Sequence, residues 1–166
     1  DAFDRYRSTK PSWHYDVVAA GYKYNLTDPA AAMGLVQLGR AIEMRDRRAH
    51  IASRYDDGLS NLGLELPTWG GNEVEHAWHL YVIRVHGDFA RDEVIEALAR
   101  MGIGTSVHFI PLHLHSFWRD FGQYSPQDLP VASAVYERTI SLPIYSAMQS
   151  DQISRVIEGV QHALVR

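Results

Sequence analysis

Residues 27–62 carry a single apolar stripe at helical spacing, and this stripe constrains the fold more than any other segment. Its members recur at intervals of three, four or seven positions: Leu35, Leu38, Ile42, Ala49, Ala52 and Leu59. Thr27 can cap the start of such a helix, and Pro29 fits its first turn, where the missing N–H costs nothing. The sequence therefore predicts one long helix, or two helices with a bend near Gly39.

The rest of the chain alternates between short strands and helices. Aromatic and β-branched residues predict strands at 77–86, 103–109 and 139–142. Apolar residues at helical spacing predict helices at 89–101 and 130–138, and a final helix capped by Ser150. These elements indicate an α/β (α+β) fold, in which helices cover a small sheet of about three strands.

The composition argues against several functional classes. The chain has 166 residues and no cysteine, which excludes disulfides, thiolate metal sites and cysteine nucleophiles. A formal net charge of -4 argues against nucleic acid and anionic membranes as partners. No apolar run reaches the roughly 18 residues needed to span a bilayer. A chain without cysteine fits a cytoplasmic protein.

The first residues of the chain resemble an internal part of a longer protein, and lysine is rare among its basic residues. Asp1 opens a stretch of mixed charges and aromatics that is neither a signal peptide nor a start methionine. We expect this stretch to pack on a preceding part of a longer protein. Only Lys10 and Lys23 are lysines among the sixteen basic residues. A mechanism that needs a lysine nucleophile therefore has two candidates here.

Histidines gather in the segment 108–115 and beside a predicted strand. His108, His113 and His115 could ligate a metal, but the segment holds no carboxylate to complete the ligand shell. We favour a loop that places imidazoles at a ligand pocket or a domain interface, and we expect no metal. In an alternating strand His79 points opposite to Trp78, so one of the two faces a cleft or a partner. A histidine packed in the core is the alternative.

The segment 21–28 combines glycine, lysine and asparagine directly before a predicted helix start. Free N–H groups and the helix dipole favour phosphate at such a position. A tyrosine-rich loop docked on the core would show a similar pattern.

Four segments together resemble the DegT/StrS family of sugar aminotransferases. They are 21–38, 76–84, 102–109 and 140–145, which occur in the order and spacing of that family and are distributed over most of the chain. Tyr22-Lys23-Tyr24-Asn25 is most similar to the branch that makes UDP-4-amino-4-deoxy-arabinose, an oxoglutarate aminotransferase. The loop Phe109-Ile110-Pro111-Leu112-His113 is closer to the general family pattern.

The resemblance implies a homodimeric fold-type-I enzyme that depends on pyridoxal phosphate (PLP). Such an enzyme moves an amino group from glutamate to a nucleotide-linked keto-sugar, with the cofactor bound to a lysine of its large domain. The resemblance places this chain after that lysine, so no catalytic residue is expected here. It implies a tail of the large domain at 1–26, a connecting helical region at 27–62 and a small C-terminal domain at 63–166.

The resemblance also assigns binding residues. Lys23 and Asn25 match the loop that contacts the cofactor phosphate of the neighbouring subunit, although the family pattern has asparagine and arginine at these positions. Tyr22, His79, His108 and His113 are expected at the nucleotide-sugar site. Two alternatives have different functions: a stand-alone binding or dimerisation module without catalysis, and a histidine-dependent metalloenzyme. In isolation the chain should expose apolar surface and self-associate.

Overall fold

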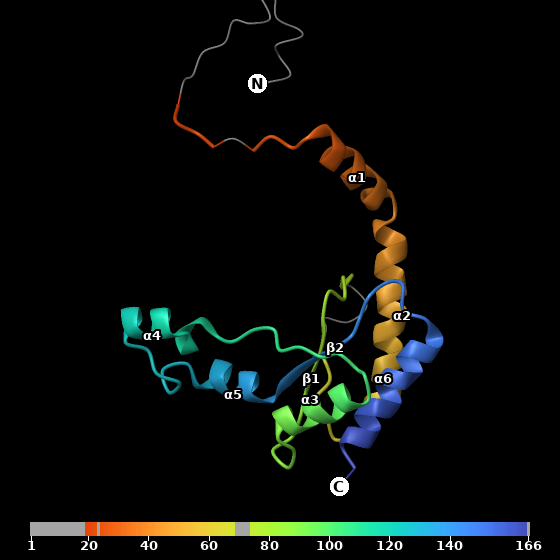
Figure 1. The fold of residues 1–166 in the computed structure, drawn as a ribbon, viewed down its shortest axis with the longest axis vertical. Coiled ribbons are helices and arrows are strands. Elements are labelled where there is room, and N and C mark those ends of the chain that lie inside the picture. The colour runs from red at the N-terminus through yellow and green to blue at the C-terminus, as the bar shows by residue number, and fades with distance from the viewer. Residues whose placement is uncertain (1–18, 23, 69–73, 166) are drawn as a thin grey trace, which may run out of the picture. The chain divides into compact units, whose positions relative to one another are not determined.

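The computed structural model describes residues 19–22, 24–68 and 74–165. The chain forms two compact units, 1–38 and 39–166, and each is described by itself (Figure 1). The boundary between the units falls inside the predicted connecting region. The predicted division at residues 26 and 62 remains a prediction.

The apolar stripe forms two helices, α1 (Asp28–Gly39) and α2 (Ala41–Leu59). The amide of Ala31 donates to the carbonyl of Thr27 at 2.9 Å, so α1 starts where the sequence predicts. The interruption after Gly39 confirms the version with two helices. None of the described helices is both long and apolar enough to cross a bilayer.

The two halves of the stripe have different environments. In α2 four side chains are buried: Ile51, Ala52, Tyr55 and Leu59. In α1 no residue is buried, and Leu35 and Leu38 are each 71% exposed. The stripe therefore enters the core of the second unit only through α2. The expectation of exposed apolar surface on the helical region is confirmed for α1.

The sheet consists of two antiparallel strands, β1 (Tyr81–Arg84) and β2 (Thr139–Leu142), with Tyr81 opposite Leu142. Each outer edge gains one bridge, Glu65 with Arg84 and Ser106 with Ser141. The predicted strand 139–142 is confirmed, whereas the predicted strand 103–109 pairs only at Ser106. The small helix-covered sheet is thus confirmed, with two strands and two edge bridges instead of three strands.

Three helices complete the core around this sheet. The helix α3 (Arg91–Arg100) packs on β2 and on α6 (Ser150–Ala163), and α6 packs on α2. Gly102 ends α3 with a φ of 72°, a left-handed conformation that glycine adopts without steric cost. The predicted cap of α6 was wrong by one residue: Gln149 is the cap, and its backbone N–H donates to the Gln152 side chain at 2.9 Å.

A long excursion leaves the core between Gly104 and Thr139, and it extends to the left of the sheet in Figure 1. It contains a short 3-10 turn (Leu112–Leu114) and two helices, α4 (Ser116–Gly122) and α5 (Pro130–Arg138). The sequence predicts α5 with these bounds, because Pro130 suits a first helical turn. It does not predict α4, which has seven residues and no buried side chain.

Candidate functional site

The predicted phosphate-contact segment belongs to the first unit. Tyr22 is 87% exposed and its ring lies 5.7 Å from that of Tyr24, centroid to centroid. Asn25 is also exposed and precedes the first turn of α1. Lys23 lies outside the described residues. Helix dipoles favour anions at this end, but Asp28 already places a carboxylate in the first turn.

His79 is exposed because its neighbour Trp78 enters the core. Trp78 is 5% exposed, and its ring stacks on that of Tyr81 at 5.9 Å. Its backbone has a φ of 46°, and its N–H donates to His76 Nδ1 at 2.9 Å. This left-handed turn ends the extended backbone before β1, so the strand is shorter than the predicted 77–86. Trp78 is buried and His79 is exposed, but neither lies in β1, so strand alternation does not explain the difference.

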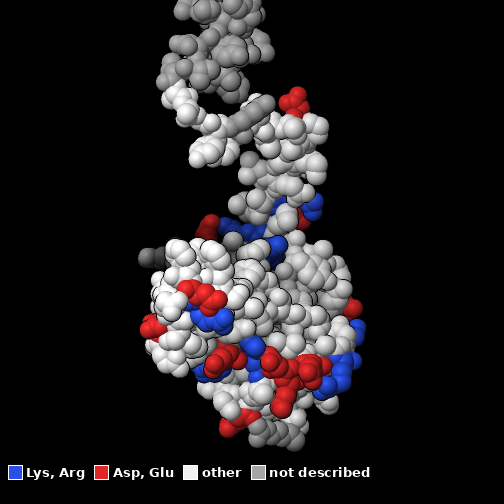
Figure 2. All heavy atoms as spheres, turned by 60° about the vertical axis from the view of Figure 1, so that its left-hand side comes forward, with Lys and Arg blue, Asp and Glu red and all other residues white. Residues whose placement is uncertain are grey.

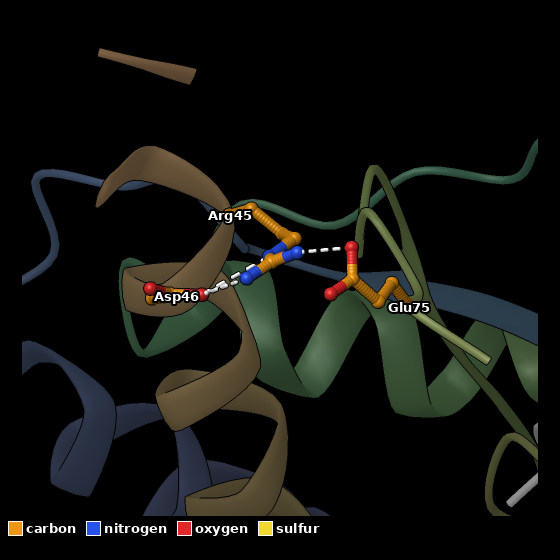
Figure 3. Close-up of polar contacts among 3 residues, drawn as sticks. All are labelled: Arg45, Asp46 and Glu75. Atoms are coloured by element: carbon orange, nitrogen blue, oxygen red, sulfur yellow. Dashed lines mark hydrogen bonds and ion pairs between the residues drawn. The ribbon is translucent and has the colours of Figure 1, made fainter. Parts of the chain in front are cut away.

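Arg45 of α2 forms hydrogen bonds that contact the segment before His79. Figure 3 shows its guanidinium between two carboxylates, with Nε and Nη2 donating to Asp46 Oδ1 at 3.0 and 2.7 Å. Its Nη1 donates to Glu75 Oε2, a contact between residues far apart in sequence. These bonds, first to Asp46 and then to Glu75, raise the pKa of Arg45. Because Glu75 is exposed, we assign the bond a role in orientation and little stability.

His108 lies at the outer edge of β2. Its ring is half-buried, and Nδ1 lies 3.0 Å from the Ser141 hydroxyl oxygen. The backbones of Ser106 and Ser141 pair at 2.7 and 3.2 Å and hold this edge in place. Phe109, in contact with the imidazole at 4.7 Å between centroids, is 76% exposed. This arrangement fixes the imidazole orientation beside an exposed aromatic ring.

His113 has a different environment, since it is only 5% exposed. Its Nε2 lies 2.8 Å from the hydroxyl oxygen of Ser133, which is buried on α5. The imidazole therefore has a protein partner inside the excursion. Its predicted contact with a nucleotide-sugar stays a prediction.

Exposed aromatic rings cover α4. Phe117 and Phe121 are 66% and 77% exposed, and their rings are nearly parallel with centroids 6.0 Å apart. Trp118 meets both rings edge-on. Figure 2, which turns the α4 side of Figure 1 toward the viewer, shows broad uncharged surface above a zone of mixed acidic and basic side chains. This aromatic surface is absent from the sequence-based prediction.

The described binding residues of the sequence prediction are divided between the two units. Tyr22 and Asn25 belong to the first unit and the three histidines to the second. Among the described residues, no hydrogen bond or ion pair joins two of these predicted positions. Nor does any group of three or more His, Asp or Glu side chains in the described ranges gather as metal ligands would.

Sequence reasoning missed the two serines that fix the histidines. Ser133 and Ser141 are separated by 20 and 33 positions from their imidazole partners. Ser141 stands in a predicted strand, and its polar side chain between Ile140 and Leu142 is a sign that could have been noticed. Nothing local marks Ser133.

Comparison with known proteins identifies the family. Residues 2–161 match the DegT/DnrJ/EryC1/StrS aminotransferase family. An uncharacterized protein of Methanocaldococcus jannaschii, MJ1066, is 47% identical over 97% of this chain and 42% of its own length. The spore coat polysaccharide biosynthesis protein SpsC of Bacillus subtilis is 42% identical over 96% of the chain and 42% of its own length.

A solved structure agrees with the fold. The putative sugar aminotransferase Spr1654 from Streptococcus pneumoniae, in its PMP-form, superposes with a TM-score of 0.85 at 33% identity. It covers 99% of this chain, whereas this chain covers 41% of it. The PLP-form of the same protein gives a TM-score of 0.83. The chain thus spans about two fifths of its relatives' length. From these matches in sequence and fold, the chain belongs to the DegT/DnrJ/EryC1/StrS aminotransferase family.

Proposed function

We propose that this chain is the C-terminal portion of a PLP-dependent sugar aminotransferase that transfers an amino group from glutamate to a nucleotide-linked keto-sugar. The observation that carries the proposal is the agreement in fold with Spr1654 over nearly the whole chain. The name of SpsC supports polysaccharide biosynthesis as the context. A cytoplasmic homodimer is part of the same proposal.

The residues present fit the cofactor's phosphate in part. The Asn25 amide and the N–H groups of the first turn of α1 are donors suited to phosphate. Asp28 weakens the positive field there, so we assign Lys23 the charge that makes the segment attractive to an anion. When bound, PLP supplies the electron sink of the reaction. This segment would hold its phosphate and supply no other chemistry.

His79 and His108 are the proposed contacts to the nucleotide-sugar. His79 is exposed on a segment that Arg45 and Trp78 fix. Ser141 engages Nδ1 of His108, which leaves Nε2 as the ring atom for a ligand. Within this substrate class, the residues Tyr22 to Asn25 favour a UDP-linked 4-keto-pentose as the amino acceptor.

The 166-residue chain alone should not form a covalent link to PLP. Its two lysines, Lys10 and Lys23, match no cofactor-binding lysine of the family. After addition of one equivalent of PLP without reduction, we expect the visible absorbance spectrum of free PLP and no band of a PLP–lysine adduct. A stoichiometric adduct band that Lys23→Ala abolishes and Lys10→Ala preserves would contradict this assignment.

The activity itself is tested on a longer protein that contains this chain. We expect it to release more than one equivalent of 2-oxoglutarate per bound PLP only when a keto-sugar nucleotide is supplied to accept the amino group. Asn25→Ala should raise the PLP concentration needed for half saturation by roughly tenfold, the effect of losing a hydrogen bond to a charged group. An open reading frame without any upstream extension would instead favour a stand-alone module.

A further inference from the structure

The excursion between Gly104 and Thr139 has almost no hydrophobic anchorage. Over that whole range the buried residues are His113 and Ser133. The end of α5 is fixed independently, because Arg91 Nη1 donates to the Tyr136 carbonyl at 2.9 Å and the Val85 amide donates to Arg138. The part that includes α4 is therefore held on α5 by a buried polar pair rather than by a core.

The other hydrogen bonds of the Ser133 hydroxyl determine whether His113 or Ser133 donates in the bond between them. A serine hydroxyl has one proton and can accept two further bonds. Two carbonyl oxygens, those of Pro126 and Leu129, lie 3.1 Å from Ser133 Oγ and can only accept. The Leu129 carbonyl already accepts a hydrogen bond from the Ser133 amide. The Pro126 carbonyl is therefore the acceptor for the Ser133 hydroxyl proton. The bond from His113 must then be donated by Nε2.

The loop between α4 and α5 is shaped to present that carbonyl. Ser125 donates through both its amide and its hydroxyl to Asp128 Oδ2, each at 2.7 Å. These bonds, the hydroxyl first, lower the pKa of Asp128. The closed turn holds Pro126 in place, and its carbonyl lies within reach of Ser133. Ser133 thus joins the 3-10 turn, the loop and the start of α5.

We propose that His113 is a positioning residue: its Nε2–H donates to Ser133 and holds the segment with Phe109 and the aromatic helix α4 on the domain. Its relevance to sugar binding rests on the proposed function, because that segment begins at the proposed contact His108. The hydrogen bonds involved join residues of this chain and include no ligand. It assigns His113 a role distinct from direct contact with substrate.

Hydrogen exchange of the 166-residue chain tests the proposal with two substitutions at one position. His113→Leu fills the space but cannot donate, so amide exchange in α4 should accelerate by about five- to tenfold. His113→Gln retains an N–H donor and should restore most of the protection. His115→Gln, at an exposed histidine of the same excursion, is the matched control and should change little.

Amides of β1 and β2 supply the internal reference, since the core should stay closed. Unchanged exchange in α4 of His113→Leu, or an equal acceleration in the strands, would overturn the proposal. So would failure of His113→Gln to protect α4 better than His113→Leu. None of these readouts requires a ligand, so a wrong proposed function would leave them unaffected.

Nitrogen NMR of the unmodified chain gives a second test that no folding defect can obscure. We expect the His113 ring to show a protonated Nε2. A ring protonated at Nδ1 instead would mean that Ser133 donates to His113, and the proposal would fail.

Discussion

Raising the pH above about 10, the ordinary pKa of tyrosine, is expected to destabilise the second unit steeply. Tyr55 and Tyr81 are both 0% exposed. Each uses its hydroxyl proton in a hydrogen bond: Tyr55 donates to the Pro143 carbonyl at 2.7 Å and Tyr81 donates to Asp56 Oδ1 at 2.6 Å. Ionisation would remove these protons and leave two charges in the core.

The direction follows from proton linkage. Burial raises the pKa of Tyr55, and burial followed by the bond to Asp56 raises that of Tyr81. The unfolded chain loses these protons near its ordinary pKa, while the folded chain still retains them. The stability contribution is therefore complete below about pH 10 and is lost as the pH rises toward the folded pKa. The free energy of unfolding should fall by about 1.4 kcal/mol per pH unit for each tyrosine.

Urea unfolding at a series of alkaline pH values measures this slope. Tyr55→Phe lowers the starting stability by about 1 kcal/mol and should halve the slope, because one of the two linked protons is gone. Tyr124→Phe changes a tyrosine that is 46% exposed and should leave the slope unaltered. If the unfolding free energy of Tyr55→Phe falls with pH as steeply as that of the parent chain, ionisation of the buried tyrosines does not cause the loss of stability.

Local sequence rules predict most elements of this fold. Pro130 marks the start of α5, and Pro143 follows the end of β2, so both elements have the predicted bounds. Gly39 marks the interruption between α1 and α2. At these positions a single proline or glycine restricts or interrupts the regular backbone conformation, so a local sequence rule is sufficient to predict the end of an element.

The deviations arise where tertiary contacts override local preference. Trp78 is of a residue type common in strands, but burial of its ring goes with a left-handed backbone. The short helix α4 has aromatics on its exposed surface, so it lacks the amphipathic period on which helix prediction depends.

The candidate binding residues come from the family resemblance, and their roles stay predictions. Spacing alone leaves His108 and His113 equivalent, as members of one histidine-rich loop. The structure separates them through Ser141 and Ser133, which are distant in sequence. A periodic pattern contains no information on such pairs, because each depends on how the excursion returns to the sheet.

Replacing Gly58 by valine is expected to destabilise the second unit by about 2 kcal/mol, the scale of overpacking in a close contact. A Cβ atom at Gly58 would lie 2.7 Å from Ile157 Cγ2 and 3.2 Å from Cγ1. These atoms are next to the Ile157 branch point, so a rotation of the distal end cannot relieve both contacts. Gln161 Nε2 also donates to the Gly58 carbonyl at 3.1 Å, which brings α6 against this backbone. Valine's better helix propensity offsets only a few tenths of a kcal/mol.

Combining the substitution with Ile157→Ala distinguishes a steric cause from a general intolerance of α2. If the introduced valine side chain collides with Ile157, Gly58→Val should cost markedly less in the Ile157→Ala background, with a coupling energy of at least about 1 kcal/mol by chemical denaturation. Gly34→Val is the matched control, because no atom beyond the neighbouring residues and the local helix backbone lies within 4 Å of a Cβ there. If the losses of unfolding free energy of the two substitutions simply add, the destabilisation by valine arises in the α2 backbone and not from Ile157. A coupling would show that the absence of a side chain at Gly58 lets α2 and α6 approach closely in the core of the second unit.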